Sequence, residues 1–328
     1  MSIGRYFGFA LEEEFGVLPQ TPIWAWTEFG SESINPPDEQ YSMYEGSTSR
    51  AAFYAAPDDY VTEGDVAIPA DIDNIGWILL GVLGKVASEQ VGATDFYKHT
   101  FTAADMLPTF RIAVGKELYE HNFEGMTFTS LEMNYEDNFV VLGLDVIGGK
   151  DSKNSTPHEI SVCDLPESIL TSLMSVFTRN NSDITPKIEE FTLNIDNNVN
   201  VEDAVPAMKR FPEIAFPEGL EIELEMDISF DSLDNLETFW GGADGPTTEV
   251  QEDDIEINFI KEEDEEELKI KLPSAVPMSY SNPVEGRSRI EQSISYSAKI
   301  DTAECEAIIV ELINDREAYE IIEEEGGE

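Results

Sequence analysis

The sequence reads DNIGWILLG at residues 73–81 and DNLETFWGG at residues 234–242. Both stretches open with Asp-Asn, continue with apolar residues at helical spacing and end near glycine, the residue that most often closes a helix. Because an Asp side chain accepts hydrogen bonds from the first free amides of a helix, we expect Asp73 and Asp234 to be N-caps. The pattern therefore predicts two short, equivalent helices that pack against a core.

The sequence around each helix repeats as well. Apolar residues alternate in FRIAV at 110–114 and in IEINF at 255–259, and polar connectors at 115–122 and 260–267 follow them as expected hairpin loops. Alternation with a period of two is typical of half-buried strands. The strand register continues at one offset, with Leu131, Met133 and Tyr135 matching Val276, Met278 and Tyr280. The repeated order of strand, helix, hairpin and strand predicts an internal duplication.

The duplication sets the expected organisation of the chain. The first copy holds extra residues within 85–109, which we interpret as an inserted surface loop. The fold class is then mainly β, with two tandem β-sandwich or barrel domains that each carry one short flanking helix. The expected boundaries are an N-terminal segment 1–24, a first domain 25–150, a linker 151–186 with a short helix near 166–177, a second domain 187–313 and a mobile acidic tail 314–328.

The charge of the chain is extreme. There are 68 acidic residues against 19 Lys and Arg, for a net charge of −49. Adaptation to high salt, a surface that repels nucleic acid, and calcium binding by acidic clusters each explain such a charge. The charge argues strongly against high-affinity nucleic-acid binding, because such binding needs clustered cations to displace counterions from phosphates.

No motif for catalysis or for a cofactor stands out. The sequence has no nucleotide-binding glycine loop and no nucleophile elbow, and His99, His121 and His158 are scattered. We expect Cys163 and Cys305 to be free, partly buried thiols, and we expect no metal and no cofactor. The N-terminus has no signal-peptide pattern, and no apolar run is long enough to insert into a membrane. With so many carboxylates, a pair suited to polysaccharide cleavage is expected by chance, so such a pair does not indicate catalysis.

Several runs resemble the tail tube proteins, or major tail proteins, of long-tailed viruses. The resemblance lies in EEEFGVLPQTPIWAWTEFGSESINPPDEQ (12–40), GDVAIPADIDNIGWILLGVLG (64–84), LPTFRIAVGKELYEHNFEGMTFTSLEMNYEDNFVVLGLDVIGGKD (107–151), EEFTLNIDNNVN (189–200), LPSAVPMSY (272–280) and VEGRSRIEQSISYSA (284–298). The resemblance implies a structural virion protein that is not an enzyme and that stacks in rings around a DNA channel. Together with the charge, it suggests a halophilic host.

What the resemblance implies about partners follows from the duplication. Related tubes use six single-domain subunits per ring, so three two-domain chains, favoured over six, would give a pseudo-hexameric ring. The other implied partners are the tail terminator, baseplate and tape-measure proteins, with assembly in the host cytoplasm. The alternatives are a baseplate or terminator protein of the same fold, and a secreted adhesion or S-layer-type module of a halophile.

Two sets of residues are candidates for function. The aromatic segment 36–65 is long and mostly non-periodic, and we expect it to reach the next ring or to cover its own domain. Its anchors would be Tyr41, Tyr44, Phe53 and Tyr54. On strand positions opposite the apolar ones, acids would line the channel or an outer solvated face, and these are Glu124, Glu132, Asp145 and Glu256.

Overall fold

In the computed structural model the chain folds as a network of antiparallel strands with two short helices. The structure describes residues 4–44, 51–52, 54–166, 168–200, 209–261, 266–284 and 290–320. The prediction of a mainly β fold is confirmed. The elements of the first half are β1 (Phe7–Leu11), β2 (Trp24–Thr27), β3 (Ser31–Glu32), β4 (Tyr41–Tyr44), β5 (Tyr54–Pro57), β6 (Thr62–Pro69), α1 (Ile75–Leu83), β7 (Gly84–Gln90), β8 (Tyr97–Ala103), β9 (Phe110–Gly115), β10 (Glu120–Glu136), β11 (Phe139–Gly148) and β12 (Asp151–Asn154).

The second half follows a connecting stretch with short 3-10 turns at Val162–Asp164, Ser172–Met174 and Thr185–Lys187. Its elements are β13 (Ser175–Arg179), β14 (Ser182–Asp183), β15 (Ile188–Asp196), β16 (Val199–Asn200), β17 (Phe216–Pro217), β18 (Glu221–Ser229), α2 (Asp234–Trp240), β19 (Asp253–Lys261), β20 (Glu266–Ser281), β21 (Glu291–Ala298) and β22 (Ile309–Asn314). Among the residues described here, no helix is long and apolar enough to cross a membrane.

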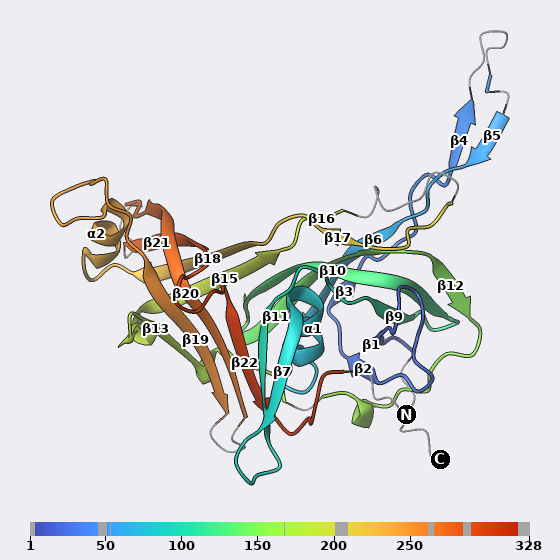
Figure 1. Ribbon diagram of the computed structural model, residues 1–328, viewed down its shortest axis with the longest axis horizontal. Helices are drawn as coiled ribbons and strands as arrows, with labels where there is room; N and C mark the ends of the chain where they lie inside the picture. Colours follow the sequence, from blue (N-terminus) through green and yellow to red (C-terminus); the bar gives the residue numbers. More distant parts are fainter. Residues whose placement is uncertain are drawn as a thin grey trace.

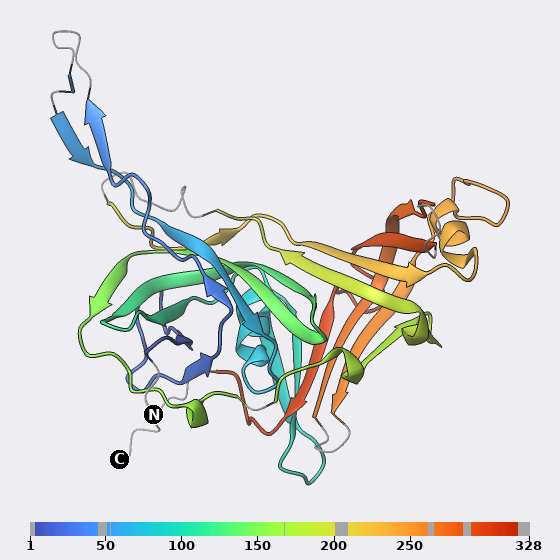
Figure 2. The same ribbon diagram turned by 180° about the vertical axis from the view of Figure 1, so that it is seen from behind.

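A long central sheet joins the two halves. Its strand order is β3-β6-β11-β10-β15-β18-β21-β20, and β10 and β15 pair at its centre, with Leu131 opposite Ile195 and Met133 opposite Leu193. The long strands β10 and β20 each continue into a second, flanking sheet. One flanking sheet has the order β2-β1-β9-β10-β12 and the other β13-β19-β20-β22-β8-β7. Figures 1 and 2 show the resulting two lobes side by side.

The strand pairings of the first half recur in the second. Strand β6 pairs with β11, β11 with β10, and β10 with β9; correspondingly β18 pairs with β21, β21 with β20, and β20 with β19. Phe123 lies opposite Ile112 in one half, whereas Leu268 lies opposite Phe259 in the other, so the pairing of the second hairpin is shifted by two residues from the offset read in the sequence. The pairing of β20 with β21 has a bulge at Pro277/Ser279, and Met278 is exposed there and not half-buried as expected.

The helices end where glycine was expected and begin differently. Gly84 and Gly241 close them in the left-handed conformation, with φ of 87° and 72°. The predicted N-caps are wrong: Asn74 and Leu233 precede the helices without a side-chain cap, and Asp234 is the first residue of α2. The amide of Asn74 instead donates to Asp71 at 2.7 Å, so the carboxylate two residues before Asp73 serves the helix start.

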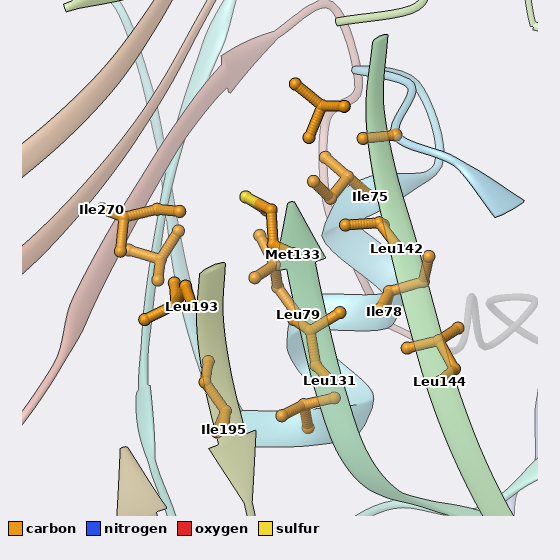
Figure 3. Close-up of a cluster of buried hydrophobic side chains, with 14 of the residues drawn as sticks. Ile75, Ile78, Leu79, Leu131, Met133, Leu142, Leu144, Leu193, Ile195 and Ile270 are labelled. Atoms are coloured by element: carbon orange, nitrogen blue, oxygen red, sulfur yellow. The ribbon is translucent and has the colours of Figure 1, made fainter. Parts of the chain in front are cut away.

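One hydrophobic core runs through both halves. Helix α1 is buried on all sides, and Figure 3 shows its side chains against β10, β11, β15 and β20. The labelled members of this cluster are Ile75, Ile78, Leu79, Leu131, Met133, Leu142, Leu144, Leu193, Ile195 and Ile270. Each such side chain contributes roughly 1.5–3 kcal/mol when fully buried. The continuous core and the central sheet therefore hold the halves together.

Three expectations about connecting segments are wrong. The extra residues at 85–109 form the hairpin β7–β8 and not a loop. The helix expected near 166–177 is absent: a 3-10 turn and strand β13 lie in the described part of that stretch. The start of the acidic tail is docked, because Tyr319 is 1% exposed and packs on Trp77 and His99. Both cysteines are free, as expected, but exposed.

Candidate functional site

One face of the central sheet is polar, and the charged side chains described on it are all acidic. Directly paired residues point to the same side of a sheet. Glu132 pairs with Gly143 and Asn194, and Asn194 with Glu223; in the neighbouring row Asp145 pairs with Asp65 and Ser130. Eight of the acids that share this face are Asp65, Glu132, Asp145, Asp196, Glu221, Glu223, Glu225 and Asp227. We call these eight residues the acidic face.

No cation lies among these carboxylates. The central-sheet segments of β3, β6, β10, β11, β15, β18, β20 and β21 contain no Lys and no Arg. Within the described parts of the chain, no ion pair involves an acid of this face. The carboxylates accept hydrogen bonds from neutral neighbours, as Asp145 does from Ser130 at 2.7 Å and Glu132 from Asn134 at 2.7 Å. A groove of about 410 Å³ runs between them.

Two acids of the flanking sheets that the sequence had singled out are paired with cations instead. Glu124 lies 3.8 Å from Arg111 and 3.3 Å from Lys150, and Glu256 lies 3.1 Å from Lys269. The structure thus brings Glu132 and Asp145 together on the acidic face and places Glu124 and Glu256 elsewhere, in neutralised environments.

Sequence reasoning missed most of the acidic face. Its densest part is β18, where EIELEMD at 221–227 alternates acid and apolar residues over seven positions. That alternation is legible in the sequence and is the signal that could have identified Glu221, Glu223 and Glu225. The contributions of Asp65 and Asp196 depend on which strands pair, and no local pattern shows them.

Among the described residues, the two outer edges of the central sheet have no further strand beside them, and they correspond to the strands that pair at its centre. Residues 31–35 lie along β6 as β15 lies along β18, with the amides of Ser33 and Asn35 donating to Asp65 and Glu63. Ile34 is fully buried there, as Leu193 is in β15. At the other end of the sheet, Val276–Ser281 pair only with β21 within the described residues. The equivalent part of β10 pairs with β11 on one side and with β15 on the other. One outer edge therefore corresponds to β15 and the other to β10, and these are the two strands that pair at the centre of the sheet.

The aromatic segment is an arm and not an irregular loop. Strands β4 and β5 pair as an antiparallel hairpin that projects away from the rest of the molecule (Figures 1 and 2). Tyr41, Tyr44 and Tyr54 are exposed, and the rings of Tyr44 and Tyr54 lie 6.4 Å apart. Phe53, the fourth expected anchor, lies outside the described residues.

Arg210 fixes the base of the arm. Its guanidinium lies 5.6 Å from the ring centre of Tyr41 and 5.1 Å from that of Tyr60, and it donates to the carbonyls of Gln40 and Asp58, both at 3.2 Å. Such stacked, hydrogen-bonded contacts orient a guanidinium firmly. The arm therefore leaves the body in a defined direction although its own strands are exposed.

Buried ionisable groups elsewhere are structural. Burial by itself raises the pKa of Glu120, but hydrogen bonds from Tyr6, His158 and Asn154 outweigh it and leave that pKa below its usual range. Burial raises the pKa of Asp71 to about 7. In the described part of the chain no cluster of His, Cys, Asp and Glu is arranged to hold a metal ion.

A family model described as phage tail tube protein matches residues 4–298, from before β1 to the end of β21. The match covers the central sheet and every strand of the two flanking sheets except β22. A comparison with the curated proteins finds no match.

Proposed function

The chain belongs to the phage tail tube protein family, and on this premise we propose that three copies close into each ring of the tube. The protein is a structural component of the virion tail, and it assembles with copies of itself and with other tail proteins. In this proposal each chain supplies two wall units, which extend the predicted domains 25–150 and 187–313 by β1 and β13. Assembly takes place in the host cytoplasm.

The open sheet edges support ring closure. At the centre of each chain, β10 of the first half pairs with β15 of the second. The free segment Val276–Ser281 of one chain and residues 31–35 of the next have the same positions in their halves. If they pair in the same way, three chains of eight central strands form one closed barrel, and neither edge of the central sheet stays exposed to solvent.

The acidic face supports a role for this barrel as the channel wall. DNA carries dense negative charge, so a wall with carboxylates and no cations gives it no site for counterion-releasing contacts. In the proposal Glu132 and Asp145 face the channel together with the other six acids of that face. Glu124 and Glu256, which are paired with cations on the flanking sheets, do not.

The arm supports stacking of rings. A two-stranded hairpin with no core of its own gains stability only when another surface covers it. The exposed rings of Tyr41, Tyr44 and Tyr54 are suited to such a contact, because aromatic side chains are favoured at interface centres. The arm of one ring is then held by the next ring. Nothing in the family match or in the described residues favours a surface module, a terminator or a baseplate protein instead.

The first test is electron microscopy of the purified protein at molar and at low salt. At molar salt the screening length is only about 3 Å, so self-repulsion is suppressed and we expect long hollow tubes with three chains per ring. Rings with six chains would refute the closure proposed here. Dispersed single chains at every salt concentration would refute the tube function itself.

A charge reversal tests the acidic face. Glu223→Lys places a cation at the centre of that face, and the matched change Glu256→Lys places one on a flanking sheet. We expect both variants to form tubes and only Glu223→Lys to retain DNA, measured as duplex DNA that cosediments with tubes at moderate salt. Equal DNA retention by the two variants would contradict the channel assignment.

A further inference from the structure

The junction between the two halves of one chain has a second layer outside the central sheet. The hairpin β7–β8 of the first half adds to β22 of the second, with Phe101 opposite Val310 and His99 opposite Leu312. Lys98 and Glu311 form an ion pair at 2.6 Å across this contact. The two halves are thus joined twice, once by β10–β15 and once by β8–β22.

The second half has no such hairpin. Helix α2 leads through residues 241–252 directly into β19, whereas α1 leads into β7 and β8. In the first half β12 stands where β22 stands in the second, since β12 pairs with β10 as β22 pairs with β20. A ring built as proposed above therefore places residues 241–252 of one chain beside the β12 edge of the next, with no hairpin to fill the space.

A groove lies at that edge. It has a volume of about 700 Å³ and is bordered by Gly149 and Lys150 just before β12, by Phe15 and by Lys209 to Glu213. Its three cations, Lys150, Lys209 and Arg210, balance its three acids, Glu14, Glu124 and Glu213. In a chain with a net charge of −49, copies repel each other least where the surface is neutral.

We propose that residues 241–252 of one chain occupy this groove on the neighbouring chain and replace the missing hairpin there. The inference rests on the ring closure proposed above. Val250 is 68% exposed and would pack against the aromatic rings of the groove, while Glu249 would approach Lys150, which is about half exposed. Two kinds of junction then alternate around the ring, one joined by β8–β22 within a chain and one joined by this contact between chains.

The exposure of α2 supports the same contact. Helix α1 is covered by the segment after β22, where Tyr319 packs on Trp77. Helix α2 has a single buried residue, Asn235, and Leu233 and Phe239 near its ends are exposed. By the internal equivalence, the surface that would cover α2 belongs to the next chain, beside its β12.

Cysteine cross-linking tests the contact directly. Both native cysteines are first replaced by Ser, because Cys163 and Cys305 are exposed. Chains with Val250→Cys are mixed with chains carrying Lys150→Cys, assembled at molar salt and treated with a short bismaleimide. Leu118→Cys, at an exposed turn of the same half, replaces Lys150→Cys in the control. We expect a covalent dimer with Lys150→Cys and none with the control.

The outcomes separate this inference from the proposed function. Tubes without the Val250–Lys150 cross-link would overturn the inference and leave the tube function intact. Failure to assemble at any salt, with no cross-link, would overturn both. As an independent measurement, Lys150→Glu should raise the concentration needed for assembly about tenfold. Glu249→Lys in the same chain should restore it, and Lys85→Glu, the same charge change on β7, should leave it unchanged. Equal effects of Lys150→Glu and Lys85→Glu would also contradict the inference.

Discussion

Removing the Tyr319 side chain should lower the free energy of unfolding of the chain by a large fraction. Tyr319 is 1% exposed, its ring centre lies 5.1 Å from that of Trp77 and 4.7 Å from that of His99, and its hydroxyl accepts a hydrogen bond from Asn314 at 2.7 Å. Loss of a buried aromatic ring costs about 3–5 kcal/mol, because the cavity does not collapse fully. Domains of ordinary size have a free energy of unfolding of about 5–15 kcal/mol.

The variants Tyr319→Ala and Tyr319→Phe separate packing from hydrogen bonding. We expect a loss of about 3–5 kcal/mol for Tyr319→Ala and of about 1 kcal/mol for Tyr319→Phe, which keeps the ring and loses the hydroxyl. The assay is urea unfolding of the unassembled chain, with Leu173→Ala, at a position that is 94% exposed, as the neutral control. If Tyr319→Ala unfolds like this control, the docking of the C-terminal segment on α1 is refuted.

Three further changes probe the helix and the arm. Burial raises the pKa of Asp71 from 3.8 to about 7, so between these two pH values the folded state retains a proton that the unfolded state has lost. The free energy of unfolding of the wild type should therefore fall by up to about 1.4 kcal/mol per pH unit as the pH rises from 3.8 to about 7. The Asp71→Asn variant should not show this fall. If urea unfolding gave the same pH dependence for the wild type and the variant, the prediction would be contradicted. Gly81→Ala should destabilise by about 1–3 kcal/mol, because a Cβ there would lie 2.2 Å from the Phe128 ring; a higher unfolding midpoint would show that the site tolerates the methyl group. Tyr44→Ser with Tyr54→Ser should leave the unfolding midpoint unchanged and shorten the tubes seen by microscopy, whereas full-length tubes would argue against a role of the arm in stacking.

Local patterns in the sequence identified the repeated elements well. The alternation around Ile112 and Ile257 gave the correct strands, although β19 meets β20 in a register that differs by two residues from that of β9 with β10. Gly84 and Gly241 end the helices because only glycine adopts their left-handed conformation without strain. These features depend on residues close in sequence, which is why they can be read directly.

What could not be read depends on contacts distant in sequence. The residues 85–109 look like a polar insertion, and they are strands because β22, more than 200 positions away, offers an edge to β8. Tyr319 lies in an acidic stretch, and only the space above Gly76, which lacks a side chain, gives it a buried position. The acidic residues posed the same problem: Glu132 and Glu256 occupy similar sequence patterns, and only strand pairing separates the unpaired one from the one beside Lys269.

The separation of charges argues that salt adaptation alone does not account for the acidity. Screening by salt acts on every surface alike, so adaptation to salt would leave acids and cations mixed over all sheets. Instead several cations pair with acids on the flanking sheets, as Lys98 does with Glu311 and Lys269 with Glu256, while the central-sheet segments of the strands have acids and no cation. A single lysine on those strands would be tolerated by the fold, because their polar side chains are solvated. Its absence from the central-sheet segments of all eight strands points to a requirement of the face itself, which is that a polyanion must pass along it without being held.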